Sequence, residues 1–430
     1  MSLDTLTQLR RGALAGAREL RLPSCGLTEF PREIFGLATT LELLDLSDNA
    51  LTSLPEDLGR LHRLRVLFCS GNRFGHLPPA LGDCAALSQL GFRATGLREV
   101  PAEALPPRLR WLTLTDNRIA SLPVALGERP ELAKLMLAGN ALQALPESLA
   151  GAPALELLRI GANRFAAPPP WLAAHPRLAW LGLAGNGFDR MEAPATPQVP
   201  WPALALGSLL GQGASGRVHR AQWQAGPVAP REVALKLFKG AMTSDGLPRH
   251  EMAACLAAGG HPALMGALGQ LTGHPEGLEG LLMPLLPEEW RVLAGPPSLE
   301  SCTRDVYAAG LRLGAPAVLG IARAVAGALA HLHARGVLHG DLYAHNILWD
   351  GTAGAAVLSD FGAACLLPAD APAGLCALEA RAFGLLAQEL LALAPAGEPT
   401  LAPLRAVEAA CLEPTPAHRP PMAEILRALG

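Results

Sequence analysis

A leucine repeat with a period of about 23 residues, within the range of leucine-rich solenoids, runs through the first half of the chain. The pattern L-x-x-L-x-L-x-x-N-x-L-x-x-L-P is clearest from Leu41 to Pro55. Its first position recurs at nearly even spacing, at positions 17, 41, 64, 87, 109, 132, 155 and 178. An amphipathic helical bundle would instead show a period of about 3.6 residues. The repeat therefore predicts a solenoid in which stacked units share one continuous core.

Each unit has a short L-x-L segment that predicts a strand of a parallel sheet. The polar position of the pattern is filled by Asn49, Asn72, Asn117, Asn140, Asn163 and Asn186, and by Cys25 and Thr95 in the other two units. A buried amide can satisfy backbone groups where the chain turns. This half resembles leucine-rich repeat proteins of the cytosolic Leu-Pro type. The resemblance implies an α/β solenoid of eight repeats over residues 1–192.

Strand residues between the buried leucines are expected to face the concave side of such a solenoid. Two columns there form an unusually apolar row, made of Leu43, Val66, Phe68, Trp111, Met136, Leu157 and Trp180. Exposed aromatic and Met-rich patches mark protein interfaces. The row predicts a surface that recruits a protein substrate or regulator; alternatively, these side chains pack on one another or on the rest of the chain.

Composition excludes several classes of protein. Half of the residues are apolar and 17% are charged, so the chain is not wholly disordered. A net charge of −3 argues against binding to nucleic acid or to an anionic membrane surface. We expect no membrane span, because even residues 315–332 contain Arg323 and His331. No signal sequence is recognised, and eight scattered cysteines without a Cys-x-x-Cys pair favour a cytoplasmic protein without a zinc site.

The second half begins after a proline-rich segment, residues 193–202, which predicts a stiff connector. Gly211, Gly213 and Gly216 then fit the pattern G-x-G-x-x-G-x-V. Such glycines let a backbone fold closely over phosphate groups. A dinucleotide site has the same glycines but continues into a helix, whereas this segment continues with strand-like alternation. The pattern therefore favours a hairpin that covers phosphates.

A lysine stands out in the strand-like segment that follows. Lys236 is one of only three lysines in the chain, and it lies in an apolar stretch. Glu251 follows it in a segment that predicts a helix. A lysine held by a carboxylate is a fixed positive charge for phosphate groups.

The string from Val337 to Leu348, VLHGDLYAHNIL, carries the most specific signal. It contains Asp341 and Asn346, and the triplet Asp360-Phe-Gly comes shortly after it. These motifs, together with the region around Arg419, resemble the protein kinase signature set. The resemblance covers residues 203–430 and implies an α+β bilobal protein-kinase-like domain. The two halves together resemble a leucine-rich repeat protein kinase, and the lysine-poor composition favours a bacterial one.

The kinase resemblance implies roles for particular residues. Asp341 would receive the proton of the substrate hydroxyl, while Asn346 and Asp360 would bind Mg²⁺ beside ATP. The remaining ATP contacts would come from the glycine loop, the charged pair, the adenine pocket and the hinge: Gly211, Gly213, Gly216, Lys236, Glu251, Val218, Ala234, Met283 and Leu286. His339 would support the catalytic loop, which lies within the string from Val337 to Leu348, by packing.

The sequence also departs from the kinase pattern. Gly340 stands where protein kinases usually carry Arg, and Tyr343 stands where they usually carry Lys or Arg. The segment between Gly362 and Glu379 is short and has no clear Ala-Pro-Glu motif. Glu379 aligns best with the start of the following D-x-x-x-F-G-type helix. Activity should therefore not depend on activation-loop phosphorylation, because phosphate ordering needs a cation partner.

These observations predict an ATP- and Mg²⁺-dependent protein kinase, with Ser/Thr favoured over Tyr. Two alternatives stay open. One is a pseudokinase scaffold in which the repeats carry the function. The other is a small-molecule phosphotransferase of the aminoglycoside or choline kinase type, since that class shares the His-Gly-Asp string and the short segment after it.

Overall fold

The computed structural model describes residues 2–189, 196–213, 215–224, 229–240, 242–243, 245–368, 371–372 and 374–430. The chain forms two compact units, residues 1–169 and residues 170–430. The eighth repeat therefore belongs with the second unit, whereas the sequence division placed it with the solenoid.

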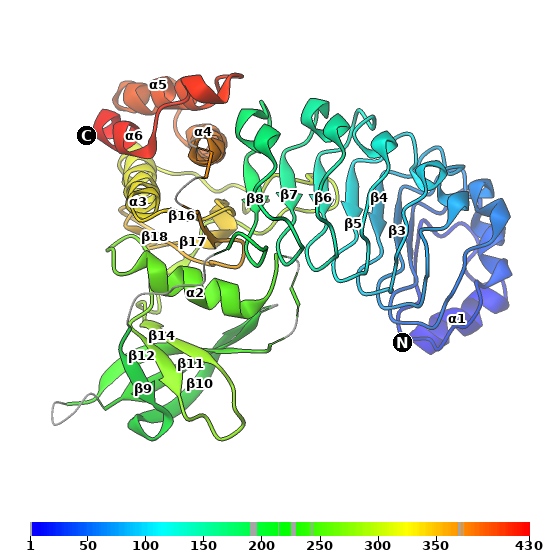
Figure 1. Ribbon diagram of the computed structural model, residues 1–430, viewed down its shortest axis with the longest axis horizontal. Helices are drawn as coiled ribbons and strands as arrows, with labels where there is room; N and C mark the ends of the chain where they lie inside the picture. Colours follow the sequence, from blue (N-terminus) through cyan, green and yellow to red (C-terminus); the bar gives the residue numbers. More distant parts are fainter. Residues whose placement is uncertain are drawn as a thin grey trace. The chain divides into compact units, whose positions relative to one another are not determined.

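The repeats form one parallel sheet in which the strands follow one another in chain order from β1 to β8. Each strand has three residues: β1 Glu19–Arg21, β2 Leu43–Asp45, β3 Val66–Phe68, β4 Gln89–Gly91, β5 Trp111–Thr113, β6 Lys134–Met136, β7 Leu157–Arg159 and β8 Trp180–Gly182. Helix α1, Ser2–Arg10, precedes β1. Within the first unit, β3 to β7 lie side by side (Figure 1). The solenoid predicted from the repeat is confirmed.

Prolines mark the return of the chain on the other side of the sheet. Short 3-10 helices occupy this side: η1 Arg32–Leu37, η2 Glu56–Arg60, η3 Pro79–Leu81, η4 Ala102–Ala104, η5 Val124–Leu126 and η6 Glu147–Gly151. A proline caps the N-terminus of each: Pro31, Pro55, Pro78, Pro101, Pro123 and Pro146. Proline lacks an N–H and has a fixed φ, so it ends the extended segment and begins the turn.

The asparagines form the predicted ladder between repeats. Asn117 Oδ1 accepts hydrogen bonds from the backbone N–H groups of Thr95 and Leu97 at 3.1 and 3.0 Å, and its Nδ2 donates to Phe92 O and Leu114 O at 2.8 and 2.9 Å. Thr95 replaces asparagine in its own repeat, and its hydroxyl donates to Phe92 O at 2.9 Å. Each amide thus satisfies backbone groups of two neighbouring turns, which is the reason for its burial.

The concave row is less exposed than the sequence predicts. Four of its first-unit residues are buried, with exposed fractions of 6% for Leu43, 8% for Val66, 7% for Met136 and 3% for Leu157. Only Phe68 and Trp111 are half-buried there. Parallel strands lie about 4.8 Å apart, so neighbouring side chains cover one another. The Phe68 ring leans over Gly91, where a Cβ would lie 2.6 Å from it, and the Lys134 ammonium lies 4.0 Å from the Trp111 ring centroid.

The second unit has a six-stranded sheet at one end, in the order β10-β11-β12-β14-β13-β9. The strands are β9 Gln198–Pro200, β10 Leu204–Gln212, β11 Gly216–Trp223, β12 Arg231–Phe238, β13 Gly269–Thr272 and β14 Gly280–Pro284. Helix α2, Pro248–Ala258, precedes β13. The sequence division assigned β9 to the connector. Instead β9 pairs with β13 in parallel. The side chain of Val199 packs into the buried core of this sheet, which holds β9 against it.

Helices dominate the other end of this unit (Figure 1). They are α3 Ala315–Ala334, α4 Leu375–Leu393, α5 Ala402–Cys411 and α6 Met422–Leu429. Short strands lie between the two ends: β15 Arg291–Val292, β16 Val337–Leu338, β17 Ile347–Trp349, β18 Ala356–Leu358 and β19 Cys365–Leu366. The second unit is therefore bilobal, with a strand-rich lobe and a helical lobe, as predicted.

Helix α3 is the one described helix long and apolar enough to cross a membrane by length and composition. Half of its most apolar window is buried inside the protein. Val318, Ile321, Val325 and Leu329 are fully buried and form one face of the helix. This spacing is that of a core helix, and the helix leads into the segment that begins with β16.

Candidate active site

The glycine loop joins β10 to β11. Gly213 N donates to Gly216 O at 2.9 Å, and Gly213 O accepts from Lys239 Nζ at 3.0 Å. A Cβ at Gly216 would overlap the carbonyl oxygen of Leu237, so this position needs glycine for the close approach of β12. At Gly211 and Gly213 a Cβ would meet nothing within 4 Å, which leaves open space beside the loop. Ala214 lies outside the described residues.

Lys236 and Glu251 form an ion pair between β12 and α2. Lys236 Nζ contacts Glu251 Oε1, and both side chains are largely buried. Burial favours the neutral amine, but the carboxylates of Glu251 and Asp360 outweigh burial and raise the pKa of Lys236. The lysine is therefore a permanent positive charge that faces both carboxylates.

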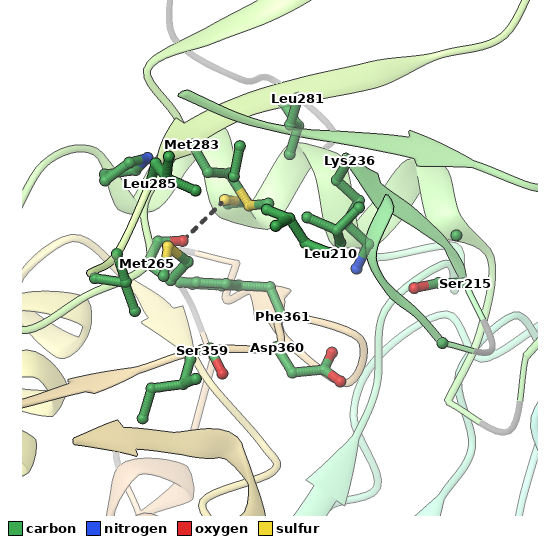
Figure 2. Close-up of a pocket in the computed structure, with 18 of the residues that line it drawn as sticks. Leu210, Ser215, Lys236, Met265, Leu281, Met283, Leu285, Ser359, Asp360 and Phe361 are labelled. Atoms are coloured by element: carbon green, nitrogen blue, oxygen red, sulfur yellow. Dashed lines mark hydrogen bonds between the residues drawn. The ribbon is translucent and has the colours of Figure 1, made fainter. Parts of the chain in front are cut away.

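A cavity of about 690 Å³ lies between the two lobes of the second unit. Its walls include most of the residues predicted to bind ATP: Gly213, Gly216, Val218, Ala234, Lys236, Glu251, Met283, Leu286 and Asp360. Gly211, Asp341 and Asn346 are not among the lining residues. Figure 2 shows Lys236 on the strand-rich side of the cavity and Asp360 on the opposite side. The cavity thus has a cation on one wall and a carboxylate on the other.

Apolar side chains from both lobes complete this cavity, and of these Leu285, Leu348 and Phe361 lie in segments that the sequence analysis singled out. They are Leu210, Met265, Leu281, Leu285, Trp290, Leu348 and Phe361. Ala234 pairs in register with Met283, so β12 and β14 present the two residues side by side. A largely apolar cavity with a few charged groups is typical of a small-molecule site. Only the fold brings these side chains together, since they come from both lobes.

The catalytic-loop residues are linked by hydrogen bonds. Asn346 Nδ2 donates to the backbone O and to Oδ2 of Asp341, both at 2.9 Å. Ser359 N and Oγ both donate to Asn346 O at 2.8 Å, which joins this loop to the segment before Asp360. His339 is fully buried, its Nδ1 accepts from Asp341 N at 3.3 Å, and its Nε2 lies 3.2 Å from Ser359 O. Both ring nitrogens of His339 therefore contact the backbone on either side of the site.

Asp360 follows β18 in a backbone conformation that few residues adopt. Its φ is 61°, in the left-handed region, and its Oδ1 accepts from Gly362 N at 2.9 Å. Strained residues of this kind persist where the surrounding structure holds them, and they cluster at functional sites. Among the described residues, no three His, Cys, Asp or Glu side chains gather as a metal site. One carboxylate and one amide oxygen suit Mg²⁺, because this ion takes its other ligands from water and phosphate.

His345 and Asp305 form a pair that the sequence analysis missed. Asp305 Oδ2 accepts from His345 N at 2.9 Å, and its Oδ1 lies 2.7 Å from His345 Nδ1. Burial opposes protonation of this imidazole, but Asp305, Asp341 and Asp360 together raise the pKa of His345. The three carboxylates are therefore within electrostatic reach of one ring. No local motif signals the pair, because Asp305 lies far from His345 along the chain.

Glu379 holds the backbone of the catalytic loop. It lies inside α4, as the helix alignment predicts, and its Oε1 accepts from Gly340 N at 2.5 Å. Its Oε2 lies 2.6 Å from His333 Nε2 on α3. Burial disfavours the imidazolium, but hydrogen bonds to Cys376 and Glu379 raise the pKa of His333 to about 10. One buried carboxylate thus ties two helices to the loop.

Comparisons with known proteins match both units. The family model for protein tyrosine and serine/threonine kinases matches residues 204–373. The leucine-rich repeat model matches residues 15–74 and 107–165. The chain therefore combines leucine-rich repeats with a protein kinase domain.

Curated relatives resemble part of the chain. Leucine-rich repeat-containing protein 58 of Mus musculus is 37% identical over 112 residues, which are 25% of this chain and 31% of that protein. Leucine-rich repeat serine/threonine-protein kinase 1 of Caenorhabditis elegans is 35% identical over 103 residues, 24% of this chain and 4% of that protein. The chain spans less than a third of the length of these relatives. A solved leucine-rich repeat protein from Leptospira interrogans superposes with a TM-score of 0.38 and 26% identity, over 42% of this chain and 52% of that one.

Proposed function

We propose that this chain is an ATP- and Mg²⁺-dependent protein kinase that phosphorylates serine or threonine in a protein recruited by its repeats. The observation that carries the proposal is the pairing of Lys236 with Glu251 opposite Asp360, in a largely apolar cavity. The preference for serine or threonine follows the resemblance to protein kinases, and one partly similar relative is named a serine/threonine-protein kinase. We place its action in the cytosol, where ATP is available and thiols stay reduced.

The chemistry of the donor set fits ATP and Mg²⁺. Lys236 offers an ammonium for the phosphates, and the open space beside Gly211 and Gly213 leaves room for phosphate groups close to the loop. Asn346 and Asp360 offer oxygen ligands for the metal ion, which neutralises phosphate charge when bound. Val218, Ala234 and Met283 offer the apolar surface that an adenine ring needs.

Asp341 would accept the proton of the substrate hydroxyl. An ionised carboxylate has room for about four hydrogen bonds, so the bond from Asn346 leaves Asp341 able to take a further one. That bond fixes the orientation of the carboxylate, and orientation of a general base is a large part of its effect.

Transfer of radiolabelled phosphate from ATP tests the proposal against its rivals. The purified chain is incubated with a mixture of protein substrates and, separately, with aminoglycosides and choline. Labelled serine or threonine in protein supports the proposal. Label only in a small molecule identifies a small-molecule phosphotransferase, and nucleotide binding without any transfer identifies a pseudokinase. The buried Tyr343, in place of a catalytic-loop cation, is the observation that favours the pseudokinase.

A protein-binding role for the repeats is the second part of the proposal. Phe68 and Trp111 remain half-exposed on the concave row, and Lys134 adds a positive charge beside Trp111. Tryptophan and aromatic anchors with adjacent charge dominate protein interfaces. Affinity capture with the full chain, compared with a Trp111→Ala variant, identifies partners that depend on this surface.

A further inference from the structure

The eighth repeat lies directly against the catalytic loop, within the second unit. The indole ring of Trp180 stacks on the ring of Tyr343, with centroids 4.4 Å apart and planes inclined by 7°. Trp180 Nε1 donates to Leu342 O at 2.8 Å, and Leu181 N donates to Gly340 O at 3.2 Å. Strand β8 therefore holds the catalytic loop on both sides of Asp341.

Gly340 is the residue type that this contact permits. Its φ is 74°, in the left-handed region, and a Cβ built there would overlap the carbonyl oxygen of Leu181. The same Cβ would lie 2.9 Å from Ala363 O. An arginine at this position is incompatible with the docked strand. The absence of the usual arginine at position 340 is thus what allows the eighth repeat to pack against this loop.

Buried arginines of the helical lobe fasten the same repeat at other points. Arg419 Nη2 donates to Pro176 O at 2.6 Å, and Arg381 Nε donates to Arg177 O at 3.0 Å. Both arginine side chains are buried. The Arg304 guanidinium lies 5.0 Å from the centroid of the Trp180 ring. Charge-assisted bonds in a desolvated setting are strong, so these contacts hold the repeat in one place.

The segment after Gly362 cannot be ordered by phosphorylation, as the activation loops of other protein kinases are. Residues 363–378 contain no serine, threonine or tyrosine. Strand β19 ends at Leu366 and α4 begins at Leu375, so only a short connection lies between them. The catalytic loop must therefore take its rigidity from another element.

We propose that the eighth repeat is a built-in clamp of the catalytic loop, with Trp180 as a positioning residue that acts on Asp341 through Leu342 and Tyr343. Fixing the carbonyl of Leu342 and the ring of Tyr343 restricts the backbone that follows Asp341. A general base displaced by about 1 Å loses much of its effect, so this restriction matters for turnover. The inference rests on the proposed kinase function and names the element that orders the loop of that enzyme.

Hydrogen–deuterium exchange of the full chain tests the clamp without an activity assay. Trp180→Phe keeps a ring opposite Tyr343 but removes the bond to Leu342 O, so exchange in residues 339–346 should rise by about fivefold. Trp171→Phe is the matched control, because the Trp171 ring packs on His175 in the same repeat segment. The control should leave exchange in residues 339–346 unchanged. No rise in the Trp180 variant, or an equal rise in both variants, overturns the clamp.

Steady-state kinetics test whether the clamp positions Asp341. Trp180→Phe should lower kcat by about fivefold to tenfold and leave the KM for ATP within about twofold, since Trp180 does not line the cavity. Trp180→Leu and Tyr343→Leu, combined, should lower kcat no more than Trp180→Leu alone, because Trp180→Leu already removes both the stack and the bond to Leu342 O. A rise in KM with unchanged kcat, or additive losses, overturns the positioning role. If the wild-type chain transfers no phosphate, the proposed function fails, and the exchange experiment still decides the clamp.

Discussion

At the scale of residues, hydrogen bonds fix Asp341 and Asn346 relative to one another. The hydrogen bonds from Asn346 Nδ2 to the backbone and carboxylate of Asp341 keep the two side chains at one geometry. Ser359 and His339 extend this network to the segment that carries Asp360. The charged groups on which phosphoryl transfer would depend are therefore fixed before any ligand binds, which is the condition for effective electrostatic catalysis.

Removing the charge of Asp341 should abolish turnover and spare nucleotide binding. In Asp341→Asn we expect kcat to fall by at least about a hundredfold, because general acid–base catalysis contributes about 10²–10⁴-fold. The affinity for ATP should change little, since Asp341 does not line the cavity. Phosphate-transfer assays and calorimetric titration with ATP measure the two quantities. Asp350→Asn, in the turn between β17 and β18, is the matched control, and wild-type turnover in Asp341→Asn would show the assignment to be wrong.

The pair of His333 and Glu379 predicts a pH dependence of stability. The folded-state pKa of His333 is about 10, above the value of 6.5 for an unperturbed histidine. A raised pKa adds stability that is complete below pH 6.5 and is lost as the pH rises through 10. The melting temperature of the wild-type chain should therefore fall more steeply between pH 7 and pH 10 than that of His333→Gln. Parallel slopes in thermal melts of the two proteins would contradict this reading.

The asparagine ladder determines the spacing of the repeats at the scale of elements. Asn117 is buried and bonds to backbone groups of two repeats, whereas Asn140 is half-buried and makes fewer bonds. Short strands and 3-10 turns have little stability of their own, so these amides and the shared leucines hold neighbouring repeats together. The regular spacing of the leucines in the sequence reflects this stacking of equal repeats.

Asn117→Ala should destabilise the solenoid more than Asn140→Ala. Loss of Asn117 leaves several buried backbone groups without partners, and each such group costs about 1–3 kcal/mol. On that scale we expect a loss of about 3 kcal/mol or more in the free energy of unfolding for Asn117→Ala and roughly half of that for Asn140→Ala. Chemical denaturation followed by circular dichroism compares the two variants. Equal losses, or a larger loss at Asn140, would mean that burial does not govern the ladder.

At the scale of the whole molecule, the eighth repeat belongs to the same compact unit as the protein kinase domain. Strand β8 is the last strand of the repeat sheet, and its side chains contact the catalytic loop. This arrangement leads to one expectation about regulation and one about recruitment.

Phosphatase treatment should leave the turnover of the purified chain unchanged. Residues 363–378 offer no hydroxyl group, and Gly340 offers no cation for a phosphate. Time courses after treatment should therefore be linear from the start, without the lag that activation by autophosphorylation produces. A lag, or a loss of activity that ATP preincubation restores, would contradict this expectation.

Recruitment by the repeats should depend on Trp111 and not on exposed apolar residues elsewhere in the solenoid. Trp111→Ala should lower the rate of phosphorylation of a captured partner by about tenfold or more, since aromatic anchors contribute about 2 kcal/mol or more to protein interfaces. ATP hydrolysis without a partner should stay at the wild-type rate. Val124→Ala, which changes an exposed side chain of η5, is the matched control. If both rates fall together with the melting temperature of Trp111→Ala, the residue is structural.

Local patterns in the sequence determined the repeats, their register, the glycine loop, Lys236 and the two catalytic-loop side chains. These features could be predicted because each depends on a few residues at fixed spacing. The leucine period follows from the number of residues in one turn of the solenoid, and the glycines follow from backbone conformations that other residues avoid. Glu251 was also within reach, since a buried lysine needs a carboxylate partner.

Only the tertiary structure decided how exposed the concave row is, which residues surround the catalytic loop and where the eighth repeat belongs. Trp180 contacts the loop at Leu342 and Tyr343, and Asp305 contacts it at His345. Trp180 and Asp305 both lie far from this loop in sequence. No spacing rule links such distant positions, because their contact depends on how whole elements pack. Gly340 shows the difference. In the sequence it is only a position without the usual arginine, whereas in the folded chain its missing side chain makes room for the backbone of strand β8.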